Sequence, residues 1–431
     1  MKGVRIGICV LVAFAVLAQG TTEAWSEAVL EIGAAALLVW WCVVTVREEP
    51  IEVHGNMLLA PMAGLWLVAM LQSLTGLSAY EFATRIEWLK GSALLALVFV
   101  TVQAFRSVKD WRNFVWFLLA LGFFASLLGI VQHFTFNGMM YWFRQMKYGG
   151  VPFGPYVNRN HFAGFVELVV PPGLALLVLR GERRDLLPLL ALFTLLPIGA
   201  LFLAASRGGI ISFFCEIILL TVLVAMRQTE WRTLAAGAVV LLLAIAMVSW
   251  IGVGRALDRF AQYRTLEVSQ ARRVEMTRDS WRIFRDHPLL GTGLGTLQQV
   301  FPRYETMYDA LVVNHAHDDY VELLADAGIV GGLLGASFLV LLFWQGARAL
   351  GESRSTTDFA LHGGALTACV GLLIHSFSDF NLHIPANLLI FLLLATLATS
   401  SPEPPGPHAV RAATNMKSSL GGGSRSISER R

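Results

Sequence analysis

The sequence predicts an all-α, polytopic membrane protein, and two observations carry this prediction. Of its 431 residues, 55% are hydrophobic and only 15% are charged, whereas about a quarter of the residues in a soluble globular domain are charged. Uncharged apolar runs recur from one end of the chain to the other, and many approach the roughly 20 residues that a helix needs to cross a bilayer. The lipid bilayer is therefore the expected environment of the protein.

The charge balance argues against a nucleic-acid partner. The formal net charge is +3, and the arginines are dispersed between apolar runs instead of forming a basic stripe. Nucleic-acid binding requires a concentrated positive surface that meets the phosphate backbone. We therefore expect no nucleic-acid partner.

The apolar runs predict about twelve transmembrane helices. The first run follows Lys2 and Arg5 and resembles a secretory signal peptide. Because acidic residues and many further runs follow it, we expect an uncleaved helix with its amino terminus in the cytoplasm. The predicted spans lie near residues 6–20, 28–46, 57–75, 88–105, 113–133, 162–179, 186–205, 210–226, 233–251, 326–346, 361–377 and 384–399.

Basic residues mark the cytoplasmic side of the predicted topology. Short loops on one side of the membrane are rich in arginine and lysine, and the positive-inside rule places that side, with both termini, in the cytoplasm. These residues are Arg47, Arg106, Lys109, Arg112, Arg180, Arg183, Arg184, Arg227, Arg232, Arg348 and Arg354.

Two loops on the other side are long and polar, 134–161 and 252–325. Long loops translocate regardless of their charge, so the arginines of the second loop do not alter the topology. Apolar residues such as Met276 recur in it at helical spacing and Pro288 follows them, which predicts a helix over about 269–286. We expect this loop to form a large helical extracytoplasmic cap.

These features divide the chain into three parts. Residues 1–133 are predicted to form N-terminal transmembrane helices. Residues 134–400 are predicted to form a second transmembrane region that includes the cap loop at 252–325. The segment 401–431 is rich first in proline and then in glycine and serine, so it is predicted to be a disordered cytoplasmic tail.

A dense polar cluster at residues 314–320 (NHAHDDY) ends the large loop. Asp319 followed by Glu322 resembles a helix-capping pair, so a helix is expected to begin there, with His317 immediately outside it. Because a histidine titrates near neutral pH, His317 is a candidate general base for a sugar hydroxyl. Two alternatives stay open: the histidines cap a loop, or they bind a metal ion together with the neighbouring aspartates.

Several arginines are expected on the same outer side as His317. Arg207 stands in the sequence SRGG at the junction of two apolar runs, where its guanidinium suits a phosphate and the glycines allow close approach. The alternative is that Arg207 snorkels to the membrane interface. Arg272 and Arg273 lie in the predicted cap helix, and Arg159 lies in the sequence NRNH just before another span.

A glycine-rich segment at residues 291–295 (GTGLG) resembles a phosphate-binding loop. It lacks the preceding strand and the lysine of such loops, so a turn after Pro288 is the preferred interpretation.

Late in the chain, a short outer turn between two spans is rich in polar residues, namely His375, Asp379, Asn381 and His383. Ionisable residues at such a position either line the same cavity as His317 or stabilise a re-entrant turn. The sequence does not separate these two possibilities.

Over roughly residues 150–400 the chain resembles the O-antigen ligase/polymerase superfamily of bacterial membrane glycosyltransferases. Ligases of this family show a histidine and a small polar residue, nine arbitrary positions and then Gly-x-x-Gly, and His317, Asp318, Gly328 and Gly331 match that spacing. The other matching segments are 158–163 (NRNHFA), 206–208 (SRG), Arg273 ahead of 286–291 (DHPLLG), and 379–382 (DFNL) ahead of 384–386 (IPA).

The resemblance implies a helical fold of the GT-C type in the inner membrane of a bacterium, with a periplasmic active face. It also implies a glycan donor on undecaprenyl diphosphate, a lipid or glycan acceptor, and inverting transfer without a metal or another cofactor. Carried over residue by residue, the diphosphate would be held by Arg159, Arg207 and Arg273, and His317 would activate the acceptor hydroxyl. The supporting residues would be Asn158, Asn160, His315, Asp318 and Asp379.

A transporter or flippase of a lipid-linked saccharide is the alternative from another functional class. Such a protein also needs many helices and cationic cavity residues, but its sites lie near the membrane midplane, often at broken helices. Here the polar residues gather in outer loops, which weighs against transport. Pro171-Pro172 and Pro197 are nevertheless expected to interrupt two spans.

Overall fold

The structure is a computed structural model that describes residues 1–47, 51–145, 151–227, 270–307 and 312–400. This part of the chain contains helices and two isolated β-bridges but no β-strand. The predicted all-α fold is therefore confirmed.

The long helices follow the apolar runs of the sequence. They are α1 (Lys2–Leu17), α2 (Ala24–Thr45), α3 (Leu59–Thr75), α4 (Glu81–Ala104), α5 (Val108–Phe134), α6 (Arg159–Val178), α7 (Leu187–Ala204), α8 (Arg207–Arg227), α11 (Gln270–Asp286), α13 (Asp319–Glu352), α14 (Thr356–His375) and α15 (Pro385–Ala398). The short ones are α12 (Leu297–Val300) and the 3-10 turns η1 (Arg184–Leu186), η3 (Phe301–Arg303) and η4 (Asn381–His383).

Eight helices in the described residues are long and apolar enough to cross a membrane, namely α2, α4, α5, α6, α7 together with η1, α8, α13 and α14. The helices α3 and α15 are apolar but shorter. Each predicted span other than 233–251 overlaps a described helix. Because that span lies outside the described residues, the number of about twelve spans stays a prediction.

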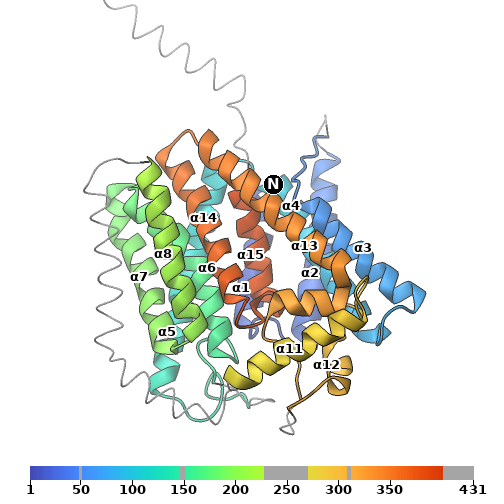
Figure 1. The fold of residues 1–431 in the computed structure, drawn as a ribbon. Helices are drawn as coiled ribbons and strands as arrows, with labels where there is room; N and C mark the ends of the chain where they lie inside the picture. The colour runs from blue at the N-terminus through green and yellow to red at the C-terminus, as the bar shows by residue number, and fades with distance from the viewer. Residues whose placement is uncertain (48–50, 146–150, 228–269, 308–311, 401–431) are drawn as a thin grey trace, which may run out of the picture.

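The centre of the bundle is formed by α6 and α14, which pack against each other along their length (Figure 1). Nearly all residues of α6 are buried. Gly364 of α14 permits this close approach, since a Cβ atom there would lie 2.5 Å from the Cα atom of Pro172. The expected interruptions at Pro171-Pro172 and Pro197 are wrong, because α6 and α7 continue through these prolines. Neighbouring helices allow a membrane helix to tolerate proline in this way.

The helix α13 bends sharply at Gly328, which adopts φ 62° and ψ −160°, a conformation that favours glycine. A Cβ atom at Gly328 would lie 2.3 Å from the carbonyl oxygen of Leu289, in the loop that follows α11. Gly291 of the same loop lies against Asp326 on the other side of the bend, and the backbone N–H of Ile329 donates to the carbonyl of Pro288 at 2.8 Å. The predicted turn after Pro288 is therefore confirmed, and it packs the loop that follows α11 against the bend in α13.

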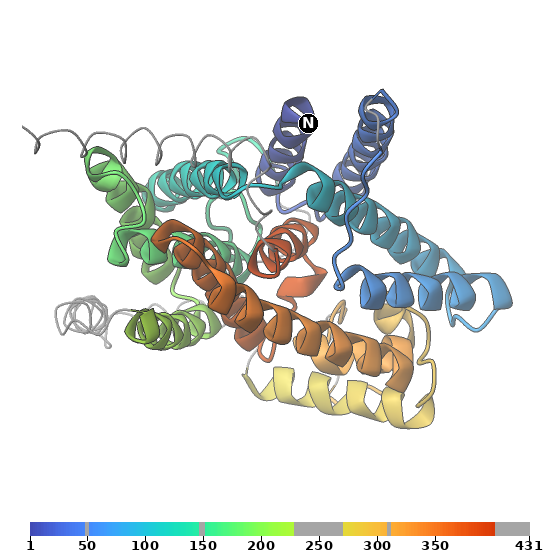
Figure 2. The ribbon, with the colours of Figure 1, turned by 90° about the horizontal axis from the view of Figure 1, so that it is seen from above.

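The helix α11 lies across one end of the bundle, alongside α13 (Figures 1 and 2). It buries Met276 and Ile283 in a small core of its own, and its observed extent confirms the helix predicted at 269–286. The opposite end of the bundle holds the start of α1, where Arg5 pairs with Asp110 at the turn between α4 and α5. Part of the predicted cap, 252–269, and the predicted tail lie outside the described residues.

The bend in α13 provides a test of the fold. Gly328→Ala should destabilise the protein by about 1–3 kcal/mol, because an L side chain at this φ and ψ is strained and meets the Leu289 carbonyl. Thermal unfolding of the purified protein in detergent measures the effect. Gly351→Ala is the matched control, since Gly351 also lies in α13 but has open space around it. Equal unfolding temperatures for the two variants would contradict this account of the bend.

Candidate functional site

A buried carboxylate, Asp379, is contacted by side chains from three other segments, namely the start of α6, α11 and the loop before α13. We call Asn160, His161, Arg273, His317 and Asp379 the Asp379 cluster. Asn160 donates its amide N–H to Asp379 Oδ2 at 2.7 Å, and Arg273 Nη1 lies 3.5 Å from the same oxygen. His317 Nδ1 lies 3.3 Å from Asp379 Oδ1, and His161 Nε2 lies 3.7 Å from it. The structure therefore brings together residues that are up to 219 positions apart in the sequence.

The charge of Asp379 is balanced by its neighbours. Its side chain is 0% exposed, and burial by itself raises the pKa of a carboxyl. The Arg273 guanidinium, together with the imidazoles of His161 and His317, outweighs the burial and holds the pKa of Asp379 well below its usual range. Asp379 is thus an ionised carboxylate at neutral pH, fixed between a guanidinium and two imidazoles.

His317 is positioned by the backbone at the start of α13. It adopts a φ of 55°, which is uncommon for a residue other than glycine and is found at functional sites. The helix begins at Asp319, as predicted, but the predicted capping pair is wrong. Asp318 is the cap, and its Oδ1 accepts the N–H groups of Tyr320 and Val321, both at 3.1 Å. Asp318 therefore fixes the helix start directly beside His317.

Asn158 and Arg159 are placed at the start of α6. Asn158 caps this helix, with its Oδ1 accepting the N–H of Asn160 at 2.8 Å. Arg159 is buried, and its Nη1 donates to the carbonyl of Ala204 at 3.4 Å. Because Ala204 ends α7 and Arg207 begins α8, Arg159 reaches the turn that carries Arg207.

The turn at Ser378, after α14, is contacted by the start of α8 and by Arg273 of α11. Arg207 is an exposed first residue of α8. A Cβ atom on the adjacent Gly208 would lie 2.7 Å from Ser378 Oγ, so the start of α8 contacts this turn. Arg273 Nη1 donates to the carbonyl of Ser378 at 2.6 Å. The side chains of Arg159 and Arg273 therefore reach two adjoining turns, one between α7 and α8 and one at Ser378, and Arg207 begins the helix that follows the first of these turns. Arg272, by contrast, is buried and pairs with Glu305 inside the cap.

A second group of acidic and imidazole side chains adjoins the Asp379 cluster. We call His315, Asp319, Glu322 and His383 the Glu322 group. His315 Nδ1 lies 2.8 Å from Glu322 Oε1, and His383 lies between the two acids, with Nδ1 2.6 Å from Asp319 Oδ1 and Nε2 3.3 Å from Glu322 Oε1. Burial lowers the pKa of His383, but Glu322 and Asp319 raise it to about 10.

Phe380 lies between the two groups. The centre of its ring is 4.3 Å from the ring centre of His315, 4.7 Å from that of His161 and 4.9 Å from that of His317. The predicted supporting residue His315 thus belongs to the Glu322 group, and Asp379 and His317 belong to the other.

Residues of the late polar turn both contact His317 and support the turn. Asp379 contacts Arg273 and His317. Asn381, by contrast, is buried and accepts an N–H from the side chain of Asn387 in α15 at 3.1 Å, so it stabilises the turn.

Sequence reasoning missed the contact between Glu167 and His375, since Glu167 was not singled out and His375 was assigned only to the late polar turn. Glu167 of α6 and His375 of α14 contact each other through Oε1 and Nδ1 at 2.9 Å, and both side chains are buried. Glu322 was predicted only as part of a cap, although it meets two histidines. A charged residue inside an apolar run, as at Glu167, is the sequence signal that points to such a partner.

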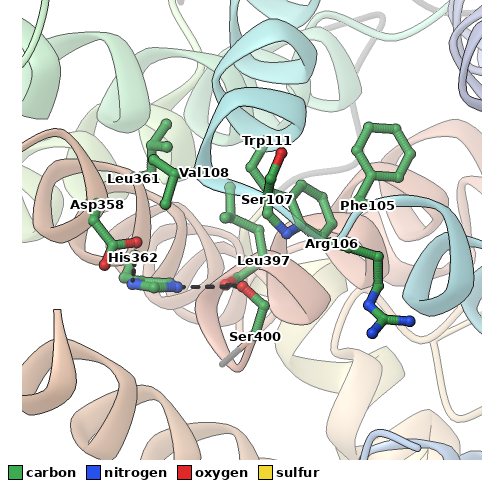
Figure 3. A pocket seen from close by; sticks show the side chains of 10 residues that line it. All are labelled: Phe105, Arg106, Ser107, Val108, Trp111, Asp358, Leu361, His362, Leu397 and Ser400. Carbon is green, nitrogen blue, oxygen red and sulfur yellow. Dashed lines mark hydrogen bonds and ion pairs between the residues drawn. The ribbon is translucent and has the colours of Figure 1, made fainter. Parts of the chain in front are cut away.

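A cleft opens at the other end of α14, away from the Asp379 cluster (Figure 3). There His362 Nε2 lies 3.2 Å from Ser400 Oγ, and its Nδ1 lies 3.6 Å from Asp358. Arg106, at the turn between α4 and α5, also lines the cleft. None of the residues that the sequence predicted for catalysis or donor binding lines this cleft.

In a comparison with known protein families, residues 191–336 match the family model of the O-antigen ligase. The match confirms the predicted resemblance to the O-antigen ligase/polymerase superfamily, and it indicates a membrane glycosyltransferase of that type. The matched segment contains Arg207, Arg273 and His317, whereas Arg159 and Asp379 lie outside it. No curated protein matches this chain.

The pairing of Asp379 with Arg273 is testable by a double-mutant cycle. Asp379→Asn leaves Arg273 without its anion, and breaking a buried pair from one side costs about 3–5 kcal/mol. Because 17% of the Arg273 side chain is exposed, we expect a loss near the lower end of that range. The double variant Asp379→Asn/Arg273→Gln should be less destabilised than the sum of the single variants, as measured by thermal unfolding. Additive losses would show that the two side chains are not coupled.

The Glu322 group predicts a pH dependence of stability. The pKa of His383 is raised to about 10 in the folded protein, and an unfolded histidine titrates near 6.5. Its contribution to stability is therefore complete below about pH 6.5 and is lost as the pH rises through about 10. In a metal-free buffer, raising the pH from 7 to 10 should lower the unfolding temperature of the wild type more than that of His383→Gln. A His287→Gln control, which changes an exposed histidine, should keep the wild-type slope. Parallel curves for wild type and His383→Gln would refute this assignment.

Proposed function

We propose that this chain, which carries the O-antigen ligase match, transfers a glycan from a polyprenyl diphosphate to an acceptor hydroxyl at the end of the bundle covered by α11. The observation that carries the proposal is the convergence of His317 and Arg273 on Asp379, with Arg159 and Arg207 around the adjoining turns. Undecaprenyl diphosphate is the proposed donor lipid, in keeping with the family resemblance.

The arginines suit the departure of a diphosphate. When the bond between the anomeric carbon and the diphosphate oxygen breaks, negative charge concentrates on the leaving group. Guanidinium groups fixed beside that oxygen stabilise the transition state more than the ground state, and their planar donors match phosphate oxygens. Arg273 is held in place by Asp379 and by the carbonyl of Ser378. In this role the arginines replace a divalent cation, so the proposed chemistry needs no cofactor.

His317 suits the role of general base. With its Nδ1 beside Asp379, its Nε2 is the atom that accepts a proton from the acceptor hydroxyl, as in other carboxylate–histidine pairs. The hydroxyl oxygen then attacks the anomeric carbon from the face opposite the diphosphate. One glycosidic bond forms, one carbon–oxygen bond to the diphosphate breaks, and the anomeric configuration is inverted.

The proposed orientation places the Asp379 cluster in the periplasm and both chain termini in the cytoplasm of a bacterial inner membrane. Arginine-rich short loops support this orientation, since Arg106 lines the cleft at one end of α14 and Arg273 of α11 contacts Ser378 beyond the other end. Lipid diphosphates and sugars are found on the periplasmic side, where nucleotides are not. Residues 252–325 would form the extracytoplasmic cap in this orientation.

The acceptor is proposed to be a lipid or a glycan, as in ligation or in polymerisation of repeat units. The alternative of a flippase gains no support from the helices, because α6 and α7 are continuous and the Asp379 cluster lies at helix ends. Transporter sites lie near the midplane instead.

Transfer by purified variants tests the roles of His317 and Arg207. His317→Ala and Arg207→Ala should each lower the rate of transfer about 100-fold or more, since a general base or a preorganised charge contributes on that scale. The assay incubates the protein with undecaprenyl-diphosphate-linked glycan and acceptor, and measures the product. Arg278→Ala is the matched control, because Arg278 is an exposed arginine of α11 that pairs with Glu275 in the same helix.

The control should keep the wild-type rate, and all variants should express and unfold like the wild type. Near-normal transfer by His317→Ala would remove His317 from the mechanism, and the same result for Arg207→Ala would remove Arg207. Transfer should also persist in excess EDTA, whereas abolition by EDTA would refute chemistry carried by arginines alone.

A further inference from the structure

Three ligand-type side chains of the Glu322 group meet at one point. The nitrogen atoms of His315 and His383 and an oxygen of Glu322 all lie within 4.8 Å of one another. Glu322 Oε1 is shared, at 2.8 Å from His315 Nδ1 and 3.3 Å from His383 Nε2. Two imidazoles and one carboxylate facing a common point form a typical ligand set for a first-row transition metal ion.

Two of the three ligand side chains, His383 and Glu322, are oriented by a further contact. Asp319 Oδ1 lies 2.6 Å from His383 Nδ1, which leaves Nε2 of that ring directed at Glu322. This carboxylate–histidine arrangement is the one that surrounds bound metal ions in proteins. The second oxygen of Glu322, Oε2, accepts the backbone N–H of Ala316 at 2.8 Å, so Oε1 alone faces the two histidines.

Burial and access also fit a metal ion. The Glu322 side chain is 2% exposed, whereas 30% of the His315 side chain and 25% of the His383 side chain are exposed. The buried acid therefore supplies a fixed anchor, and the two imidazoles leave a path for entry and open coordination positions. Nitrogen ligands favour Zn²⁺ over Mg²⁺ and Ca²⁺, which prefer oxygen ligands.

The three ligands tie together segments that hold His317. His315 lies two residues before His317, Glu322 lies in the first turn of α13, and His383 lies in η4, close to Asp379 in the sequence. A metal ion here would join the loop, the helix and the turn. Phe380 separates this point from the Asp379 cluster, so the ion would not touch the groups that react.

We propose that His315, Glu322 and His383 bind one Zn²⁺ ion, and that this ion positions the loop carrying His317 without taking part in the transfer chemistry. The binding site stands on its own geometry, whereas the positioning role rests on the proposed function.

Metal binding is tested on the full chain, purified in detergent with an affinity tag that contains no histidine. The protein is stripped with a chelator, loaded with Zn²⁺ or Co²⁺ and dialysed, and the retained metal is measured by elemental analysis and by the visible absorption of Co²⁺. The wild type should retain one equivalent. His315→Gln and His383→Gln should each lose it, and His287→Gln, which alters an exposed histidine of the cap, should keep it. Asp319→Asn should weaken zinc affinity about 10–100-fold, as expected for a residue that orients a ligand.

Failure to retain metal in the wild type, or equal retention by the wild type and His383→Gln, would overturn the site. Each variant is unfolded thermally once in EDTA and once with zinc in place of EDTA. Zinc should raise the unfolding temperature of the wild type and of His287→Gln, but not that of His315→Gln or His383→Gln. A zinc-induced rise in His383→Gln equal to that of the wild type would also overturn the proposal.

The positioning role has a separate readout. Restoring zinc to the stripped wild type should raise the transfer rate severalfold, and the rate of His383→Gln should not respond. His317→Ala should bind zinc normally and stay inactive. An unchanged wild-type rate on zinc loading would refute the positioning role, and absence of transfer in every form would refute the proposed function while leaving the binding result to decide the zinc site.

Discussion

An ionised carboxylate removed from water is stable only when cations and hydrogen-bond donors surround it. Asp379 is such a carboxylate, and its requirement for partners explains much of the outer end of the bundle. Arg273 must reach it from α11, Asn160 from the start of α6, and His317 from the loop before α13. The cap is therefore connected to the membrane helices by charge as well as by apolar packing. The candidate site exists because these requirements are met at one carboxylate.

The loop that holds His317 is fixed from two sides. On one side His317 contacts Asp379, and on the other His315 contacts Glu322. The ring of Phe380 fills the space between the two histidines. An imidazole that acts as a base must keep one nitrogen oriented while the other meets the substrate. Opposed anchors at positions two residues apart provide such an orientation in a loop that has no helix of its own.

The helices could be predicted from the sequence because an apolar run of about 20 residues is a local signal. Arg207 could be identified as a candidate because charge at the junction of two apolar runs is costly, and His317 because it stands in a dense polar cluster and a histidine titrates near neutral pH. The roles of Arg159 and Arg273 came from the family resemblance. The direction in which each side chain points could not be predicted from the same pattern. Arg272 and Arg273 are adjacent, but Arg272 pairs with Glu305 and Arg273 with Asp379, in the turn after α14, because successive helical residues point about 100° apart. The cap also depends on the local conformation, since Asp318 has an extended backbone and its side chain accepts N–H groups from the first turn of α13.

The position of the bend in α13 gives the histidine–glycine spacing a geometric meaning. The helix between Asp318 and Gly328 contains nine residues, and at 1.5 Å per residue it is about 13.5 Å long. One end of this segment is held by the loop seated at Gly328, and the other end carries the imidazole. Adding or removing a single residue would rotate that end by about 100° about the helix axis. The length of this segment therefore fixes the direction of His317, and only a change close to a whole number of helical turns would keep His317 facing Asp379.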